Sequence, residues 1–494
     1  MSQHTRPRIL IINHDVVGQR MAGPGIRAWH MARVLAAHGA VTLIAPRPID
    51  LQSPDFACGD YRWGDAASLA GWLKRADVVV ANGFVLEAHP ELANISQPLA
   101  LDLYDPVLLE NLELMREQPP EARAARAATD QQLLARQLAA GDFFLCATER
   151  QRDLYLGALM LAGRLTPAQI DADATARALI DVAPFGLDPT PPVRQGPALR
   201  GVLPGIGADD PLLLWTGGLW DWLDPLTLIA ALPAVRTHHP NVRLVFLAGR
   251  HPGNVPDMRV PNEARALAEA HGLLNTHVFF YEEWVPYERR ADFLLEATLA
   301  VSLHRNHLET AYAAVRSRFL DHLWAGLPSL VSDGDAAAAL VRAHSLGAVV
   351  PPGNSEATAE ALTGLLEDAG YCAECAAHAR ALAPEFAWER VLTPLVQFCT
   401  NPRRTRPAQP KNGLVLQRRE RLNEQQRALI RQLEANWRLD APAAPGPRGL
   451  AQQLLRRLLA PVFAQQRAFN AAALKLVYTL SEPPEPSDTE HNQA

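Results

Sequence analysis

The chain has 494 residues, more than one hydrophobic core usually holds, and this length predicts two domains with an appended segment. Hydrophobic residues make up 48% and charged residues 20%, an ordinary globular composition that excludes disorder throughout. A formal net charge of -6 argues against a protein built to bind nucleic acid. Five cysteines in so long a chain do not form a disulfide framework, and they favour the reducing cytosol.

The first residues of the chain do not have the pattern of a secretory signal peptide. The apolar run at residues 9–12 ends at Asn13, far short of a signal-peptide core. No stretch reaches the roughly 18 apolar residues that a membrane-spanning helix needs. We therefore expect a cytoplasmic protein, and a peripheral contact with the inner face of the membrane stays open.

The first half alternates between expected strands and helices. A strand at residues 8–12 leads through a glycine-bearing loop, 18–25, into a helix over 26–38 that ends at Gly39. The elements expected next are strands at residues 41–45, 77–81, 99–103 and 143–147, and a helix over 121–140. Strands that alternate with helices predict a parallel sheet of the α/β class.

A second alternating series begins near residue 210. The elements expected there are strands at residues 212–215, 243–248, 277–281, 299–303, 329–332 and 347–350, and helices over 225–235, 263–271 and 318–325. The predicted fold class is therefore α/β, with two Rossmann-like, doubly wound domains and a helical C-terminal extension. A cleft at the carboxyl ends of their strands is the default ligand site.

The domain boundaries follow from changes in composition. We place the first domain at residues 1–190 and the second at 205–400. The run from residue 189 to 204 is rich in proline and glycine, as is typical of a linker between domains.

Residues 401–494 are expected to form a basic, amphipathic helical extension. Residues 411–475 hold 12 Lys and Arg against 4 Asp and Glu. Leucines at four-residue steps over 448–469 indicate an amphipathic helix that Pro461 kinks. The acidic, proline-rich tail from Ser481 is expected to be disordered.

Two candidate site segments lie in the first half. Gly23, Pro24 and Gly25 precede a helix N-terminus, whose free N–H groups favour a phosphate or an anionic acceptor, although a plain tight turn fits equally well. Asp105 lies just past the strand at 99–103, where side chains of an α/β domain point at the cleft. A carboxylate ahead of a proline also fits a helix cap, and one residue can serve both purposes.

The most telling segment of the second half is WTGGLWDW, at residues 215–222. Gly217 and Gly218 let backbone N–H groups approach a phosphate closely. Trp220 suits stacking on a base or a sugar, with core packing as the alternative. Two arginines farther along, Arg316 and Arg318, suit a diphosphate, because guanidinium groups bind phosphate oxygens with paired hydrogen bonds.

A short acidic motif follows the strand at 329–332. Asp333, Gly334 and Asp335 suit the hydroxyl groups of a sugar. The same D-x-D spacing also suits a metal ion, but we favour the sugar and predict no metal. Cys372 and Cys375 form a lone C-x-x-C with no second pair to complete a metal site.

These segments together resemble the GT-B glycosyltransferases, specifically the large retaining group often called family 4. The resemblance rests on GPGIRAWHMARVLAAHG (23–39), DLYDPVLLENL (102–112), FLCATERQRDLYLGAL (144–159), DVAPFGLDP (181–189), LLWTGGLWDWLDPLTLI (213–229) and RSRFLDHLWAGLPSLVSDGD (316–335). It implies a nucleotide-diphosphate sugar bound by the second domain, an acceptor bound by the first, no metal and no cofactor. It also implies that the segment from Phe386 forms a final helix that returns to the first domain.

The family's glutamate pair is altered in this chain. Alignment on the AGLP turn places Asp321 at the second glutamate and Ala313 at the first, and Glu309 lies one helical turn earlier. We therefore take Glu309 and Asp321, with Asp105, as the catalytic candidates. The histidine that members carry near the reacting sugar is missing at Tyr104 and Asp105.

The family's basic clamp is altered as well. Members commonly have an arginine and a lysine after the glycine pair, whereas residues 220–224 read WDWLD. The missing positive charge would have to come from Arg250, Arg316 or Arg318. These three arginines complete the donor-binding candidates.

The sequence thus predicts a retaining glycosyltransferase that acts on an envelope polysaccharide or a lipid-linked acceptor. The basic extension would suit an anionic membrane surface, with packing on the body or on another subunit as the alternative. A non-catalytic GT-B protein that binds a nucleotide or a partner transferase is the first alternative, motivated by the two departures. A nucleotide-sugar epimerase, which would convert the donor without an acceptor, is the second.

Overall fold

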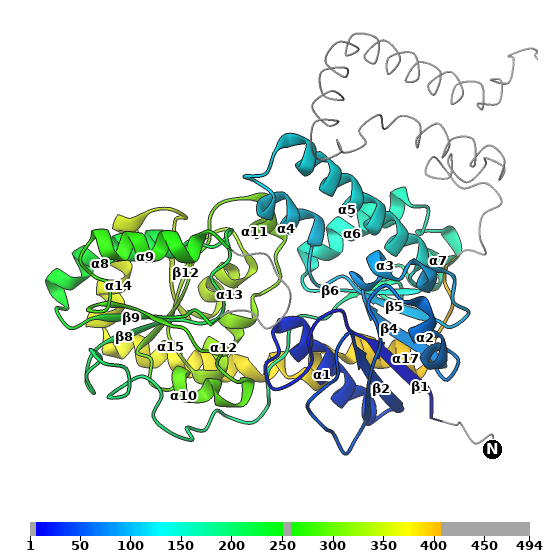
Figure 1. The fold of residues 1–494 in the computed structure, drawn as a ribbon, viewed down its shortest axis with the longest axis horizontal. Coiled ribbons are helices and arrows are strands. Elements are labelled where there is room, and N and C mark those ends of the chain that lie inside the picture. The colour runs from blue at the N-terminus through cyan, green and yellow to red at the C-terminus, as the bar shows by residue number, and fades with distance from the viewer. Residues whose placement is uncertain (1–5, 250–257, 407–494) are drawn as a thin grey trace, which may run out of the picture. The chain divides into compact units, whose positions relative to one another are not determined.

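The computed structural model describes residues 6–249 and 258–406, and the strands in these residues form two parallel sheets (Figure 1). The strand order is β3-β2-β1-β4-β5-β6-β7 in the first sheet and β10-β9-β8-β11-β12-β13 in the second. The first sheet contains β1 (Arg8–Ile12), β2 (Ala40–Ala45), β3 (Ala57–Asp60), β4 (Val78–Asn82), β5 (Leu99–Asp102), β6 (Phe143–Cys146) and β7 (Ile180–Val182). The second contains β8 (Leu212–Trp215), β9 (Arg243–Leu247), β10 (Val278–Tyr281), β11 (Leu299–Ser302), β12 (Ser329–Ser332) and β13 (Gly347–Val350).

Helices connect most successive strands in both sheets, and β2 and β3 are joined without one. In the first half they are α1 (Gly23–Ala36), α2 (Ala66–Leu73), α3 (Val85–Ala88), α4 (Val107–Leu114), α5 (Pro120–Ala140), α6 (Glu149–Leu161) and α7 (Pro167–Ala172), with a 3₁₀ turn at Pro90–Asn94. In the second half they are α8 (Pro225–His238), α9 (Val260–Ala270), α10 (Arg290–Leu294), α11 (Leu308–Tyr312), α12 (Ser317–Ala325), α13 (Ala336–His344), α14 (Ser355–Glu367) and α15 (Ala369–Leu382), with 3₁₀ turns at Tyr287–Arg289 and Ala383–Phe386. The last two helices are α16 (Trp388–Val391) and α17 (Thr393–Thr400).

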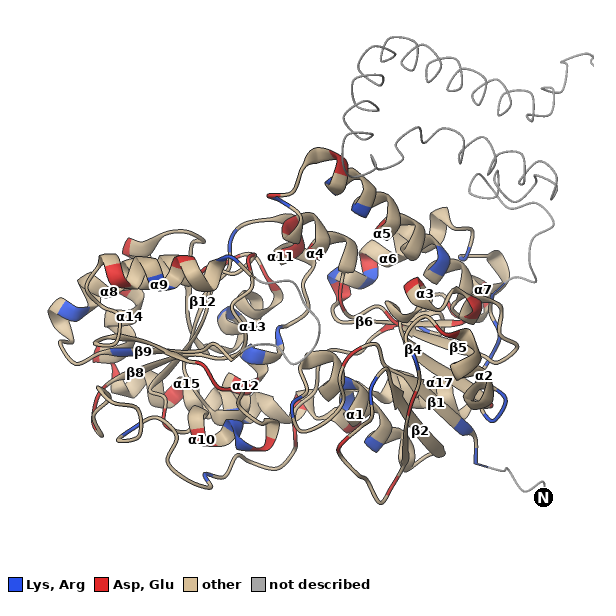
Figure 2. Cartoon of the chain, viewed as in Figure 1, with Lys and Arg blue, Asp and Glu red and all other residues tan. Residues whose placement is uncertain are grey.

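The central strands are continuous apolar runs because helices cover both faces of a parallel sheet. β5, β6, β8 and β11 are buried at every position. Most of the charged residues in Figure 2 therefore lie on helices and loops, whereas the strands are almost uncoloured. The predicted α/β class with two doubly wound sheets is confirmed.

The start of α1 corrects one prediction. Gly23, Pro24 and Gly25 were expected in a loop, but they form the first turn of α1, with Ala22 extended ahead of them. Pro24 suits the first turn, because the N–H group that proline lacks has no partner within a helix there. Gly25 is required by packing, since a Cβ atom there would lie 2.2 Å from the carbonyl oxygen of Val16.

The end of the described chain returns to the first sheet, as the resemblance implies. Trp388 of α16 stacks on His30 of α1, with ring centroids 4.8 Å apart. Phe398 of α17 stacks on Phe143 of β6 at 5.0 Å. These contacts tie the segment after the second sheet to the first half of the chain.

Some predictions fall outside the described residues. Arg250 and the amphipathic helix expected over 448–469 belong to this group. In residues 6–249 and 258–406, no helix combines the length and the apolar character that a membrane crossing requires.

Candidate functional site

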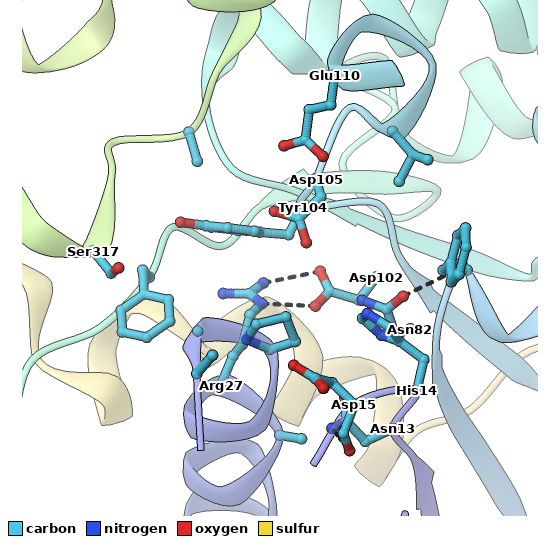
Figure 3. Close-up of a pocket in the computed structure, with 18 of the residues that line it drawn as sticks. Asn13, His14, Asp15, Arg27, Asn82, Asp102, Tyr104, Asp105, Glu110 and Ser317 are labelled. Atoms are coloured by element: carbon cyan, nitrogen blue, oxygen red, sulfur yellow. Dashed lines mark hydrogen bonds and ion pairs between the residues drawn. The ribbon is translucent and has the colours of Figure 1, made fainter. Parts of the chain in front are cut away.

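A cavity of about 810 Å³ lies at the carboxyl ends of the strands in the first sheet, and residues of the second half complete its wall. Asn13 follows β1, Asn82 ends β4 and Asp102 ends β5, and all three line the cavity (Figure 3). Gly23 and Pro24, in the first turn of α1, line it as well. Polar side chains at this edge are expected, because parallel strands of a doubly wound sheet direct their carboxyl ends at the ligand.

A buried ion pair forms the floor of the cavity. Arg27 of α1 donates hydrogen bonds from Nε and Nη2 to the two carboxylate oxygens of Asp102, at 2.7 and 3.0 Å. Both side chains are about 95% buried. Arg27 also donates to the carbonyl oxygens of Pro184 and Ala183, and its guanidinium lies over the ring of Tyr104. Every charged atom of this pair is therefore compensated within the protein.

Two further carboxyl groups, those of Asp105 and Glu110, line the cavity without such compensation. Burial, the charge of Asp102 and the charges of Glu309 and Asp15 raise the pKa of Asp105 to about 7, against the opposing effect of Arg27. Glu110 lies on α4, and burial, followed by the charges of Asp105 and Glu309, raises its pKa well above the usual value. The predicted catalytic candidate Asp105 thus lies in the cavity.

Glu309 and Arg316 form a second buried pair in the opposite wall. Nη2 of Arg316 donates to Oε1 and Oε2 of Glu309, at 3.1 and 2.9 Å, and Glu309 is 1% exposed. His307 caps α11, and its Nδ1 atom lies 3.6 Å from Oε2 of Glu309. Both members of the pair line the cavity, as a catalytic carboxylate and a donor-binding arginine should.

Arg318, at the start of α12, lines the same wall and is 8% exposed. Its Nη2 atom donates to the carbonyl oxygen of Gly218 at 2.9 Å, and its guanidinium lies over the ring of Trp215. Burial and the nearby charge of Arg316 lower the pKa of Arg318. The charge on this side chain is thus poorly compensated by the protein.

Three buried N–H groups in the cavity wall have no hydrogen-bond partner among the described residues. They are Nη1 of Arg318, Nε of Arg316 and Nε1 of Trp222. Buried donors are nearly always paired in proteins, so three unpaired donors in one wall indicate a site for an oxygen-rich ligand.

The loop after β8 presents two tryptophans to the cavity. Trp220 and Trp222 stack with ring centroids 5.2 Å apart and an interplanar angle of 14°. The carbonyl oxygen of Trp222 lies 3.0 Å from Nε2 of His307, which ties this loop to α11. A Cβ atom at Gly218 would lie 3.2 Å from Nε1 of Trp220, so glycine there allows the indole to approach.

Gly217 and Gly218 do not line the cavity directly. Gly217 has φ +76, a conformation that favours glycine, and it packs against the guanidinium of Arg318. Gly218 supplies the carbonyl oxygen that Arg318 binds. In the structure this backbone contacts an arginine, and its close approach to a phosphate stays a prediction.

Asp321 and the acidic motif are also outside the cavity lining. The Asp321 carboxylate accepts a hydrogen bond from Nε of Arg290 at 3.2 Å. Asp333 is paired with Arg342 at 2.6 Å, and Asp335 caps α13 by accepting from the N–H group of Ala338. All three contacts are made within the protein. Asp321 does not reach the cavity because its position on α12 directs it toward Arg290 of α10.

Gly334 and Gly25 do not line the cavity either. Gly334 has φ +111 and belongs to the turn between β12 and α13. Among the described residues, no group of three or more His, Cys, Asp and Glu side chains has a geometry that could hold a metal ion.

Comparison with known proteins agrees with this geometry. Residues 210–368 match the family model of the glycosyl transferases group 1. These residues are therefore similar to the group 1 glycosyltransferase domain. No curated protein matches the chain.

Solved glycosyltransferases share the fold of the whole described chain. Sucrose-phosphate synthase from Thermosynechococcus elongatus has a TM-score of 0.56 and 17% identity, over 80% of this chain and 98% of its own. WaaG, a glycosyltransferase involved in lipopolysaccharide biosynthesis, has a TM-score of 0.56 and 17% identity, over 80% of this chain and 100% of its own. HepE from Anabaena, solved in complex with UDP-glucose, has a TM-score of 0.55 and 16% identity, over 78% of this chain and 97% of its own. The architecture is therefore GT-B, and the group 1 domain with this fold supports glycosyl transfer.

Sequence reasoning missed several residues of the cavity. Arg27 lies inside the first helix, and its pairing with Asp102 depends on a contact between distant parts of the chain. Glu110 stands in the segment DLYDPVLLENL, five residues beyond Asp105, and an acidic residue in the first turn of the helix after a buried strand is the signal that could have found it. Residues 210–368 contribute Arg316, Arg318, Trp220 and Trp222 to the site, and the first half contributes most of its carboxylates.

Proposed function

We propose that the protein is a retaining glycosyltransferase that takes a sugar from a nucleotide-diphosphate donor. The observation that carries the proposal is Arg318, a cation 8% exposed in the cavity wall whose Nη1 group has no partner in the described residues. A diphosphate would supply both the missing negative charge and the missing acceptor atoms. The group 1 domain and its GT-B fold support the same chemistry.

The donor would lie with its diphosphate against Arg316 and Arg318. The first turn of α1, where Gly23 and Pro24 line the cavity, adds free N–H groups at a helix N-terminus. Preorganised cations and helix dipoles stabilise a departing diphosphate without reorganisation, and so we propose transfer that does not depend on a metal ion. Trp220 is placed to stack on the base or the sugar.

The acceptor would enter from the side of the first half, where Asp105 is the catalytic candidate. We propose an envelope polysaccharide or a lipid-linked glycan, supported by the basic composition of residues 411–475. WaaG, which shares the fold, is involved in lipopolysaccharide biosynthesis.

Turnover of the donor tests the proposal. The purified chain would be incubated with UDP-, GDP-, dTDP- and ADP-sugars in the presence of EDTA, and nucleoside-diphosphate release would be followed with and without acceptor glycans. We expect release with one base class, and NMR of the product should show the anomeric configuration of the donor. Release that requires magnesium would refute metal independence, and an inverted product would refute retention.

One observation favours the non-catalytic alternative. The loop that carries a basic pair in the family presents Trp220 and Trp222 here, and Asp221 accepts hydrogen bonds from the N–H groups of Arg259 and Val260. Nucleotide-sugar binding without turnover, in the presence of every acceptor class, would support this alternative.

A further inference from the structure

Glu110 is a cavity residue to which the proposed reaction gives no role. It lies in the first turn of α4, directly after the strand end that carries Asp105, and α4 contacts α11 of the second half. Figure 3 shows its carboxyl group directed toward Asp105 and Tyr104, across the cavity from the α1 helix. The side chain therefore occupies the space where a ligand of the first half would lie.

The two carboxyl groups lack partners in the protein. Neither Asp105 nor Glu110 accepts a side-chain hydrogen bond from a described residue, whereas the nearby Asp102 carboxylate receives two from Arg27. Both residues are partly exposed to the cavity, so their carboxyl oxygens are available to the hydroxyl groups of a ligand.

An independent feature of the same cavity also points to a ligand. Arg318 is more than nine-tenths buried in the wall, and its Nη1 group is unpaired. In the second half, Arg316 is paired with Glu309, whereas Arg318 keeps an unpaired donor. In the first half, Arg27 is paired with Asp102, whereas Asp105 and Glu110 form no ion pair with a described residue. An anionic group therefore fits beside Arg318, and a neutral, hydroxyl-rich group fits beside Asp105 and Glu110.

We propose that Glu110 is a sugar-binding residue that works as an uncharged carboxylic acid, donating a hydrogen bond to a neutral sugar ring while Asp105 accepts one from a ring hydroxyl. This inference rests on the proposed function, because the ring belongs either to the transferred sugar or to the acceptor. A ring that carries a phosphate or a carboxylate at this position is excluded by repulsion from the acidic wall.

The charged groups around Glu110 explain why it stays protonated. Burial raises its pKa most, the charges of Asp105 and Glu309 raise it further, and Arg316 opposes them. The titratable and charged groups that face the pair from the packed elements are Asp15, Arg27, Asp102, Tyr104, Glu309 and Arg316. Two interacting carboxyl groups in such surroundings titrate as a pair that holds one proton over part of the pH range, and the proposal places this proton on Glu110.

Three variants test the role of the proton. Glu110→Gln keeps a neutral hydrogen-bond donor, Glu110→Ala removes it, and Glu113→Gln on the same helix is the control, because Glu113 pairs with Arg116 outside the cavity. We expect the kcat/KM of the parent to fall on the alkaline side of its pH profile, as Glu110 loses its proton. Glu110→Gln should keep most of the neutral-pH activity and lack this fall, whereas Glu110→Ala should lose roughly tenfold or more at every pH. An alkaline fall unchanged in Glu110→Gln, or equal losses in both variants, would overturn the proposal.

Binding measurements with the donor and kinetic measurements with the acceptor identify which sugar ring Glu110 binds. If the ring is the transferred sugar, Glu110→Ala should weaken binding of UDP-glucose, or of the sugar nucleotide that the parent prefers, without weakening the free nucleoside diphosphate. If the ring is the acceptor's, donor binding should be unchanged and the KM for the acceptor should rise. Unchanged affinity for both would overturn the inference while leaving the proposed function intact.

A measurement without ligand separates the two claims. If the parent bound no nucleotide, the proposed function would fail, but the uncharged state of Glu110 would still be testable by thermal unfolding. A carboxyl group whose pKa is raised in the folded state lowers the stability as the pH rises from its unfolded pKa to its folded pKa, because the unfolded chain has already lost the proton. The Tm of the parent and of Glu113→Gln should therefore fall more between pH 5 and pH 7 than the Tm of Glu110→Gln. Parallel Tm curves over this range would show that Glu110 is already ionised, against the proposal.

Discussion

Nη2 of Arg316 donates hydrogen bonds to both carboxylate oxygens of Glu309, at 3.1 and 2.9 Å. The Nε group of Arg316 has no partner among the described residues and lies in the cavity wall. Glu309 is 1% exposed, so it can neither leave this contact nor be solvated without rearrangement. The carboxylate therefore fixes the guanidinium while leaving part of it available. This relationship gives Glu309 a defined effect on the proposed diphosphate site.

The pair should be coupled energetically. Glu309→Ala and Arg316→Ala should each lower the free energy of unfolding by about 3 kcal/mol, because each leaves a buried charge without its partner. The double variant should lose less than the sum, by about 1 to 3 kcal/mol, in chemical denaturation. The exposed pair Arg265 and Glu282 is the matched control, where the coupling should be below about 1 kcal/mol. Additive losses at Glu309 and Arg316 would contradict the account.

Arg318 should dominate affinity for the diphosphate. Arg318→Ala should weaken binding of the preferred nucleoside diphosphate roughly 10- to 100-fold, because it removes a charge-assisted hydrogen bond in a buried site. Arg318→Lys should recover part of this loss, and Arg265→Ala should leave the affinity unchanged. Titration calorimetry at constant salt measures all three, with unfolding of each variant checked first. If Arg318→Ala binds like the parent, the diphosphate lies elsewhere.

The fold was largely predictable from apolar runs. Strands such as β8 and β12 are short, continuous and bounded by glycine or proline, and their predicted bounds are those of the structure. β3 and β7 were not predicted, because ACGD and IDV mix polar and small residues at the edges of the sheet. Edge strands are less buried and so carry a weaker hydrophobic pattern.

The site was predictable only in part, for a different reason. Asp105, Glu309 and Arg318 stand at strand or helix ends, and their position in the fold brings them into one cavity. The direction of a side chain on a helix is not visible in a motif, and Asp321 consequently turned toward Arg290. The sequence analysis did not predict Glu110 as a site residue, because Glu110 belongs to no recognisable motif. Its lack of a partner among the described residues of the cavity is visible only in the structure.

Asp105 should destabilise the free protein above neutral pH. Its pKa is raised from 3.8 to about 7 in the folded state, so the folded chain holds a proton that the unfolded chain has lost, and stability falls as pH rises through this window. Asp105→Asn should therefore raise the Tm at pH 8 and leave it nearly unchanged at pH 3.5, where both residues are neutral. The same variant should lose transfer activity and the acid limb of the pH profile near pH 7. A Tm at pH 8 equal to the parent's would show that Asp105 is not held in a desolvated site.

Trp220 should report which part of the donor it contacts. Trp220→Ala should weaken donor binding by roughly 10-fold, and Trp220→Phe by less, because a smaller ring retains part of the stacking. If the indole stacks on the base, the nucleoside monophosphate should lose affinity in the same proportion as the sugar nucleotide. A loss confined to the sugar nucleotide assigns the indole to the sugar. Equal affinity in parent and variant for every ligand would place Trp220 in packing alone.

The most direct test of the central claim is thermal stabilisation of the purified chain by nucleotide-sugars without added metal. UDP-, GDP-, dTDP- and ADP-sugars would be compared in EDTA, with Arg318→Ala alongside the parent. A ligand that binds only the folded state raises its stability in proportion to the logarithm of saturation, about 2.7 kcal/mol at a hundredfold excess over Kd. The account predicts a rise in Tm with one base class that Arg318→Ala abolishes. No rise with any donor, with or without magnesium and acceptor, would contradict it.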